Sequence, residues 1–282
     1  MITEDVFKLS NMDRLLYYIS EREAIRLKKT HNKPKPWTDD EILQTYRFTN
    51  VRRMDDKVSV WLLDNWYTRY FNHLNMVVAC TLARFINNPS TLEVIGFPTA
   101  WNSDKIRQDL RSYRDIGNHI FNAAYMVRGN DGIDKISAVV DHYCQPLVDD
   151  PVSVDPDSMF RTWSKIKRRY GFGSFMAGQV VADLRHAVKG NWKDKDTWAP
   201  VGPGSMRGLN RLLNRPIKYV VSQEQFLTEL TEIIKDCRMK VGNSITDRME
   251  AHDYQNCLCE YDKYERVLNL EGRPKQLYPG KR

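Results

Sequence analysis

Apolar residues recur at three- and four-residue spacings over most of this 282-residue chain, and this pattern constrains its fold more than any other feature. The clearest stretch begins at Val58, where tryptophan, leucine, tyrosine and valine side chains form one apolar stripe up to about Asn87. Such a stripe is typical of a helix with one buried face. Because later segments repeat the spacing, we predict a mainly α-helical protein.

Helix boundaries can be predicted from capping residues. Thr38-Asp39-Asp40-Glu41 forms a capping box, which predicts a helix start at that point. The stripe from Val58 predicts one long helix. Residues 189–203 follow neither helix nor strand periodicity and predict an ordered loop. Further helices are expected over residues 103–126, 133–143, 158–170, 174–188, 222–241 and 253–268, with a break at 128–132.

No composition break divides the chain, so we expect one mainly helical domain. Its boundaries are 38–270, preceded by a helical extension over 1–37 and followed by a basic tail over 271–282. With 41% hydrophobic and 28% charged residues, the chain can bury a large core. A formal charge of +7 favours polyanionic partners modestly.

Several classes of protein are disfavoured by simple patterns. There is no apolar run of about 18 residues and no secretion signal at the start, so we expect a cytoplasmic protein without membrane contact. The five cysteines are odd in number and mostly isolated, which predicts reduced thiols. Cys257 and Cys259 are too close for the usual zinc pair. We therefore expect no metal and no cofactor.

Two glycine-containing turns suggest phosphate binding. Gly171 and Gly173 stand between a basic run and an apolar helix pattern, where exposed amides could hold an anion at the helix N-terminus. Since neither a P-loop nor a dinucleotide motif is present, the turns favour DNA over a free nucleotide. The alternative is that they are ordinary helix connectors. The candidate DNA-binding residues are Lys167, Arg168, Arg169, Gly171, Gly173, Ser174, Gly202, Gly204 and Arg207.

Four motifs together resemble a known family. They are Tyr-Arg-Phe-Thr-Asn-Val-Arg-Arg-Met-Asp-Asp-Lys-Val at 46–58, Gly-Phe-Gly-Ser-Phe-Met-Ala at 171–177, Gly-Pro-Gly-Ser at 202–205 and Leu-Cys-Glu-Tyr-Asp-Lys-Tyr at 258–264. The chain resembles the alpha-glutamyl/putrescinyl thymine pyrophosphorylases of phage thymine hypermodification, a clade also found as the helical domain of 5-hydroxymethyl-deoxyuridine DNA kinases. The resemblance covers about residues 38–268.

The resemblance implies a helix-hairpin-helix DNA glycosylase-like fold, with its hairpin near residues 165–189. It further implies an enzyme that flips a modified thymine out of double-stranded DNA. Such an enzyme would displace the phosphate of 5-phosphomethyl-deoxyuridine with an amino acid or a polyamine, in a phage-infected bacterial cell. A DNA-base kinase is an implied partner, because this chain has no P-loop lysine of its own.

That chemistry needs cations for the leaving phosphate and a base for the incoming amine. The segment around Arg47 supplies both kinds of group, and in the alternative interpretation it is only a solvated helix face. The candidate substrate-binding residues are Arg47, Thr49, Asn50, Arg52 and Arg53, with Asp56 as a candidate acid.

Three further residues are catalytic candidates. The resemblance to glycosylases places an aspartate about twenty residues beyond the glycine turn, where Asp196 stands, with Asp183 and Asp194 as rivals. A loop carboxylate that caps the next turn is an equal alternative for Asp196. Glu260 and Lys263 share one side of a helix, although an intrahelical ion pair is the commoner role for such a spacing.

Three functions remain open at this point. The leading one is the transferase, the second is a glycosylase that excises a modified base, and the third is a DNA-binding or kinase-accessory module without catalysis. The sequence does not identify the amine donor.

Overall fold

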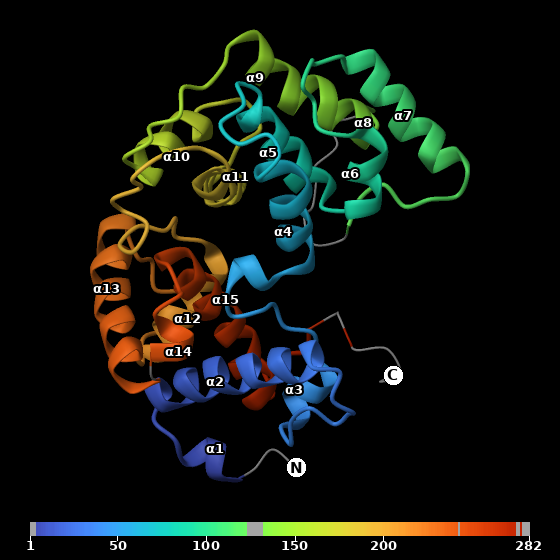
Figure 1. Cartoon of the computed structure of the whole chain (residues 1–282). Helices are drawn as coiled ribbons and strands as arrows, with labels where there is room; N and C mark the ends of the chain where they lie inside the picture. Colours follow the sequence, from blue (N-terminus) through green and yellow to red (C-terminus); the bar gives the residue numbers. More distant parts are fainter. Residues whose placement is uncertain (1–3, 123–131, 242, 275–276, 278–282) are drawn as a thin grey trace. The chain divides into compact units, whose positions relative to one another are not determined.

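The computed structural model describes residues 4–122, 132–241, 243–274 and 277, and these are mainly helical (Figure 1). The described residues contain no named strand, and Tyr46 and Leu277 form an isolated antiparallel bridge. The prediction of a mainly α protein is therefore confirmed. Residues 123–131, which include all but the last residue of the predicted helix break at 128–132, lie outside the described residues.

The chain divides into two compact units, and the boundaries 38–270 stay a prediction. Unit 1 combines residues 1–56 with 195–282, and unit 2 is the continuous stretch 57–194. The chain leaves unit 1 after Asp56 and returns to it at Lys195. No change of composition marks either crossing, so the division had no signal in the sequence.

Unit 1 is built around its last helix, α15 (Ala251–Leu268), which packs against α2, α3, α12 and α13. Its core contains the fully buried rings of Tyr18, Tyr254, Tyr261 and Tyr264. The other elements of unit 1 are α1 (Glu4–Lys8), α2 (Asn11–Thr30), α3 (Glu41–Thr45), η1 (Arg53–Asp55), α12 (Pro203–Leu212), α13 (Gln223–Lys240) and α14 (Asn243–Thr246).

Helices α12 and α15 approach closely because glycine lines the crossing. A Cβ on Gly204 would overlap the thiol of Cys259, and one on Gly208 would overlap the main-chain carbonyl of Leu258. Figure 1 shows the two helices side by side in unit 1. Gly204 therefore has a packing role at this crossing.

Unit 2 is built around α5 (Met76–Ile86), whose side chains are all buried, and α11 (Ser174–Ala187), which packs against it. The remaining elements are α4 (Lys57–Leu62), the π-helical η2 (Leu63–Tyr67), α6 (Pro89–Ile95), α7 (Ser103–Asp115), α8 (Lys135–Ser137), the π-helical η3 (Ala138–Cys144), α9 (Gln145–Asp149) and α10 (Met159–Lys167).

A buried ion pair joins these two central helices of unit 2. Arg84 on α5 donates two hydrogen bonds to the carboxylate of Asp183 on α11, one of them 2.7 Å long. The same guanidinium donates to Ser59 at 2.9 Å and to Asn87 at 3.3 Å. The rival catalytic candidate Asp183 is thus the counterion of a buried arginine.

Several predicted helices differ from the observed ones at their ends. The single helix expected from Val58 is wrong, because turns over residues 68–75 separate η2 from α5. The helix from Ser103 starts as predicted but ends at Asp115. The capping residue of α3 is Asp40, which accepts from Ile42 and Leu43, and not Thr38. The predicted starts at Ser158, Ser174 and Ser222 lie within one residue of the observed helix starts.

The five cysteines are free in the structure, as predicted. Cys80, Cys144, Cys237 and Cys257 are buried, and Cys259 is partly exposed. Burial raises the pKa of Cys259 to about 11, so this thiol stays protonated at neutral pH. No reactive thiolate therefore arises there.

Candidate functional site

The segment 46–56 lies along one face of α15, and this pairing brings several predicted site residues together within unit 1. The main-chain N–H of Thr49 donates to the carboxylate of Glu260 at 3.0 Å. Asn256 donates from its side-chain amide to the Thr49 hydroxyl at 2.8 Å. Residues 256 and 260 are one helical turn apart, so they face the same part of the segment. Thr49 is consequently held through both its main chain and its side chain.

Lys263 extends this contact by another turn of α15. Its ammonium group donates to the main-chain carbonyl of Arg47 at 2.8 Å and lies 2.6 Å from the carboxylate of Glu260. It also lies 4.5 Å from the ring centroid of Phe48, a cation–π distance. The intrahelical ion pair is therefore present, but the same lysine also holds the segment 46–56. The side chain of Arg47 is exposed beside it.

Asp253 anchors the other end of the segment and was missed in the sequence analysis. Its carboxylate accepts the main-chain N–H of Arg53 at 2.8 Å and that of Glu250 at 3.0 Å. Burial raises the pKa of Asp253 to about 6 although both hydrogen bonds oppose the rise. The capping box of Glu250 and Asp253 was the available signal, since it places a carboxylate at the start of α15.

Arg22 on α2 supports the segment from within and also escaped prediction. Its Nη2 donates to the side-chain oxygen of Asn50 at 2.6 Å and to the carbonyl of Phe48 at 3.3 Å. Asn50 in turn donates to the carbonyl of Asp55 at 2.6 Å, which closes the segment into a loop. No motif surrounds Arg22 in the sequence, so its place could not be inferred there.

Two further arginines meet at Asp55, next to the candidate acid Asp56. Arg26 and Arg52 each lie 3.4 Å from the Asp55 carboxylate. Arg26 also pairs with Glu23 at 2.6 Å, and that carboxylate is buried. Arg52 is thus one of two arginines beside Asp55, and the roles predicted for Arg53 and Asp56 stay predictions.

Asp196 lies near the start of α15, apart from the contacts of Glu260 and Lys263. It forms ion pairs with Lys195 at 2.8 Å and Arg238 at 3.1 Å. Burial acts to raise the pKa of Asp196, but the two cations outweigh it and hold the pKa below its ordinary value. Its rival Asp194 caps α10, accepting from the N–H groups of Met159 and Phe160.

In unit 2, the region near residues 165–189 where we predict the hairpin contains the end of α10, a turn over residues 168–173 and α11. Lys167 and Arg168 are exposed, whereas Arg169 forms an ion pair with Asp150. Gly171 has a φ of +75°, and a Cβ there would overlap the ring of Tyr143. A Cβ on Gly173, the N-cap of α11, would meet nothing within 4 Å. Gly171 is needed for the turn itself, and Gly173 leaves open space at the start of α11.

The second predicted turn belongs to unit 1 and is more strongly engaged in packing. Gly202 is the N-cap of α12, and its N–H donates to the Ser205 hydroxyl at 3.0 Å. Arg207 donates to the buried carboxylate of Asp262 at 2.9 Å. Arg211 binds the same carboxylate at 2.8 Å. Arg207 therefore has a structural partner, although its side chain stays partly exposed.

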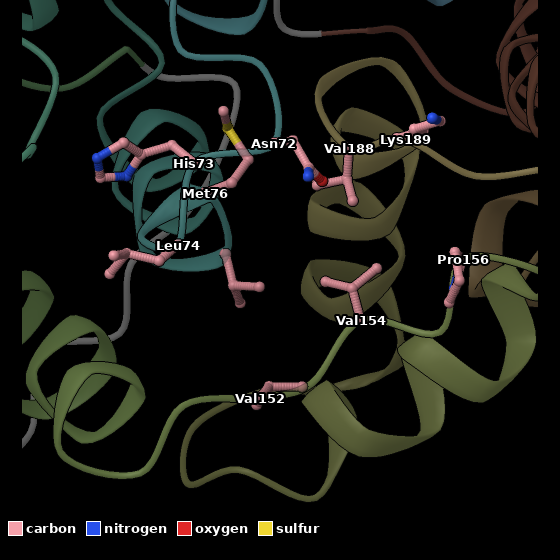
Figure 2. A pocket seen from close by; sticks show the side chains of 10 residues that line it. Asn72, His73, Leu74, Met76, Val152, Val154, Pro156, Val188 and Lys189 are labelled. Carbon is pink, nitrogen blue, oxygen red and sulfur yellow. The ribbon is translucent and has the colours of Figure 1, made fainter.

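A cavity of about 310 Å³ in unit 2 contains none of the predicted site residues (Figure 2). Its walls are mainly apolar and include Leu74, Val152, Val154 and Val188. His73 and Lys189 are the ionisable groups among its lining residues. We therefore place the candidate site at the segment 46–56 and not in this cavity.

Comparison with known proteins agrees with the resemblance of the motifs. A family model described as the helical domain of 5-hmdU DNA kinase matches residues 10–273, which is most of the chain. The chain belongs to this family of kinase helical domains. A curated relative from Bacillus phage SP10, named 5-hmdU DNA kinase, is 28% identical over 226 residues. The aligned region covers 69% of this chain and 35% of that kinase, so this family member spans about a third of the relative's length. No solved structure matches the chain.

The described part of this helical domain contains no helix that is both long and apolar enough to cross a membrane. Over the same described ranges, no group of three or more histidine, cysteine or acidic side chains is placed to hold a metal ion. Acid, base and cation chemistry from protein side chains is what the described site residues offer.

Proposed function

We propose that this helical domain acts on 5-phosphomethyl-deoxyuridine in double-stranded DNA and replaces the phosphate with an amino acid or a polyamine. The observation that carries the proposal is the contact of α15 with the segment 46–56, which brings Glu260 and Lys263 against the main chain of Arg47 and Thr49. These residues come from two of the motifs that carry the family resemblance. A glycosylase-like fold that flips the base belongs to the same proposal.

In the proposed reaction, the nitrogen of the amine attacks the methylene carbon attached to C5 of the pyrimidine. The new C–N bond forms as the C–O bond to phosphate breaks, and the phosphate leaves with the bonding electrons. Arg47, Arg52 and Arg53 hold the phosphate, because guanidinium groups bind phosphoryl oxygens well. Glu260 accepts the proton that the amine loses, with Asp56 and Asp196 as the other candidate bases.

Lys263 has a positioning role in this proposal. Its ammonium group holds both the Glu260 carboxylate and the main chain at Arg47, so it fixes the base relative to the phosphate-binding segment. A neighbouring hollow of about 420 Å³ in unit 1 provides space for the amine donor. Glu41 and Arg273 line it beside Tyr46, and their opposite charges suit a zwitterionic amino acid.

A second function is favoured by the length of the relative. Since the match covers 35% of a protein named as a kinase, this domain could instead bind modified DNA for a separate kinase activity. The exposed cations Lys167 and Arg168 would contribute to DNA affinity both in a transferase and in a DNA-binding module. In this alternative, substitutions at Glu260 would leave DNA binding and kinase support unchanged.

The test is nucleoside mass spectrometry of duplex DNA carrying 5-phosphomethyl-deoxyuridine, after incubation with the protein and a pool of amino acids and polyamines. A heavier thymidine derivative that has lost phosphate would support the transferase and identify the donor. Abasic DNA would favour a glycosylase, and unaltered DNA would favour the accessory module. Glu260→Gln should abolish product, whereas Glu229→Gln on α13, which alters the ion pair of Glu229 with Arg215, should not.

A further inference from the structure

Arg22 is a buried cation whose charge is not matched within the described residues. Its side chain is 5% exposed, and its Nε and Nη1 groups are buried without a hydrogen-bond acceptor. The two acceptors of Nη2 are the Phe48 carbonyl and the Asn50 side-chain amide, which are both neutral. Burying a charged group without a counterion or full hydrogen bonding opposes folding strongly. A residue with this defect is expected where an anion binds.

The surroundings of Arg22 add positive charge on the same side of α2. Arg26 lies one turn further along the helix and, like Arg52, is near the Asp55 carboxylate. Asn50 links the two parts of the cluster, because it accepts from Arg22 and donates to Asp55. Arg26 and Arg52 therefore form ion pairs with Asp55 and Glu23, whereas the described residues provide no ion pair for Arg22.

The ion pairs of Arg26 and Arg52 with Asp55 are long. The Oδ2 of Asp55 lies 3.4 Å from both Arg26 and Arg52, but it is buried without a hydrogen bond to either. The cluster thus contains buried polar atoms without hydrogen bonds at two residues, Arg22 and Asp55. An oxyanion has enough acceptor oxygens to bind several guanidinium groups at once.

We propose that Arg22, with Arg26 and Arg52, forms a binding site for the phosphate of a phosphate monoester. The anion reaches the guanidinium from the side of Asn50, which is partly exposed and occupies Nη2 in its absence. This inference rests on the proposed function only for the source of the phosphate, which is either the modified base or the released inorganic ion. The site itself needs no transfer chemistry.

The test is hydrogen–deuterium exchange on the full chain, read in peptides that cover residues 46–56. Inorganic phosphate, compared with chloride at equal ionic strength, should slow exchange of these amides in the wild type. Arg22→Met should lose this effect and should be at least as stable as the wild type in chloride, because it removes an unmatched buried charge. The local peptides separate this site from phosphate bound at the hairpin of unit 2.

Arg14→Met is the matched control on α2. Arg14 pairs with the buried carboxylate of Glu265 at 2.8 Å, so its loss should lower stability and yet keep the phosphate effect at 46–56. If Arg22→Met retains the full phosphate effect, or loses as much stability as Arg14→Met, the proposal is overturned.

A second arm uses duplex DNA with 5-phosphomethyl-deoxyuridine and the same duplex without the phosphate. Protection by inorganic phosphate and by the phosphorylated duplex, but not by the unphosphorylated duplex, assigns the site to the phosphate group in both its base-linked and its released form. Protection by inorganic phosphate without protection by the phosphorylated duplex assigns it to the released ion. Protection without any product in the mass-spectrometric test would leave the phosphate site standing while the transferase fails.

Discussion

Among the described residues, each unit has one arginine classed as buried, and the two differ in how their charge is matched. Arg84 in unit 2 is 1% exposed and is bound by Asp183, Ser59 and Asn87. Arg22 in unit 1 is 5% exposed and meets only neutral acceptors in the described residues. A fully bonded buried charge holds a core together, whereas an unmatched one weakens the fold that contains it. The difference indicates that unit 2 uses its arginine for structure and unit 1 keeps its arginine for binding.

The largest expected effect comes from removing the counterion in unit 2. Asp183→Asn leaves the Arg84 charge buried and unmatched, which should lower the free energy of unfolding by about 3–5 kcal/mol. Urea unfolding followed by circular dichroism measures this loss. Asp155→Asn is the control, because Asp155 pairs with the exposed Arg161 and its loss should produce no comparable change. Equal effects of the two variants would remove the contrast between the buried arginines.

A somewhat smaller effect is expected at the helix crossing that holds α15 in unit 1. Gly208→Ala places a methyl group against the carbonyl of Leu258, which cannot move without shifting α15. Overpacking of this kind should cost about 1–3 kcal/mol in unfolding free energy. Gly173→Ala, whose new methyl meets nothing within 4 Å, should keep wild-type stability. A stable Gly208→Ala protein would mean that the crossing is more adaptable than its geometry indicates.

How far the sequence predicts this molecule depends on whether a feature is local. Helices α10, α11, α13 and α15 were predicted within a few residues, because their caps and apolar spacing lie within the helices themselves. The long helix from Val58 failed because its stripe continues across the turns at 68–75, where the apolar spacing gives no break signal. The division into two units depends on contacts between residues far apart in the chain, which no local pattern reports.

The candidate site was predicted in part for the same reason. Glu260, Lys263 and the segment around Thr49 were selected from motifs, and the structure joins them. Arg22 carries no motif, and Asp253 stands in a capping box that marks a helix start and not a site, so the importance of both comes from burial and from contacts across more than twenty residues. Asp196 was selected by distance along the chain, which says nothing about its pairing with Arg238.

Asp253 makes the cost of a buried charge in unit 1 measurable as a function of pH. Its pKa is about 6 in the folded state and 3.8 ordinarily, so the folded protein binds more protons than the unfolded chain between these values. The contribution of Asp253 to stability is therefore largest below about pH 4 and is lost as the pH rises through 6. Relative to Asp253→Asn, the wild type should lose about 1 kcal/mol or more over this range, measured by urea unfolding at several pH values. A constant difference between the two proteins would mean that Asp253 titrates normally.

The smallest effect on stability is expected at the hairpin of unit 2. There, exposed amides and side chains, and no buried arginine, are proposed to bind the phosphates of the DNA backbone. Gly173 has a φ of −84° and open space around its missing Cβ, so Gly173→Val should fold normally. The valine side chain would shield the amides at the start of α11, and DNA affinity should fall about ten-fold, or about 1.4 kcal/mol, across all sequences. Fluorescence anisotropy with unmodified duplex DNA measures this change, and Arg22→Met should leave the affinity for that DNA unaltered. If Gly173→Val binds DNA as strongly as the wild type, the hairpin amides do not contact DNA. If Arg22→Met loses affinity for unmodified DNA, Arg22 also contributes to binding the DNA backbone, and its site is not specific for the phosphate monoester.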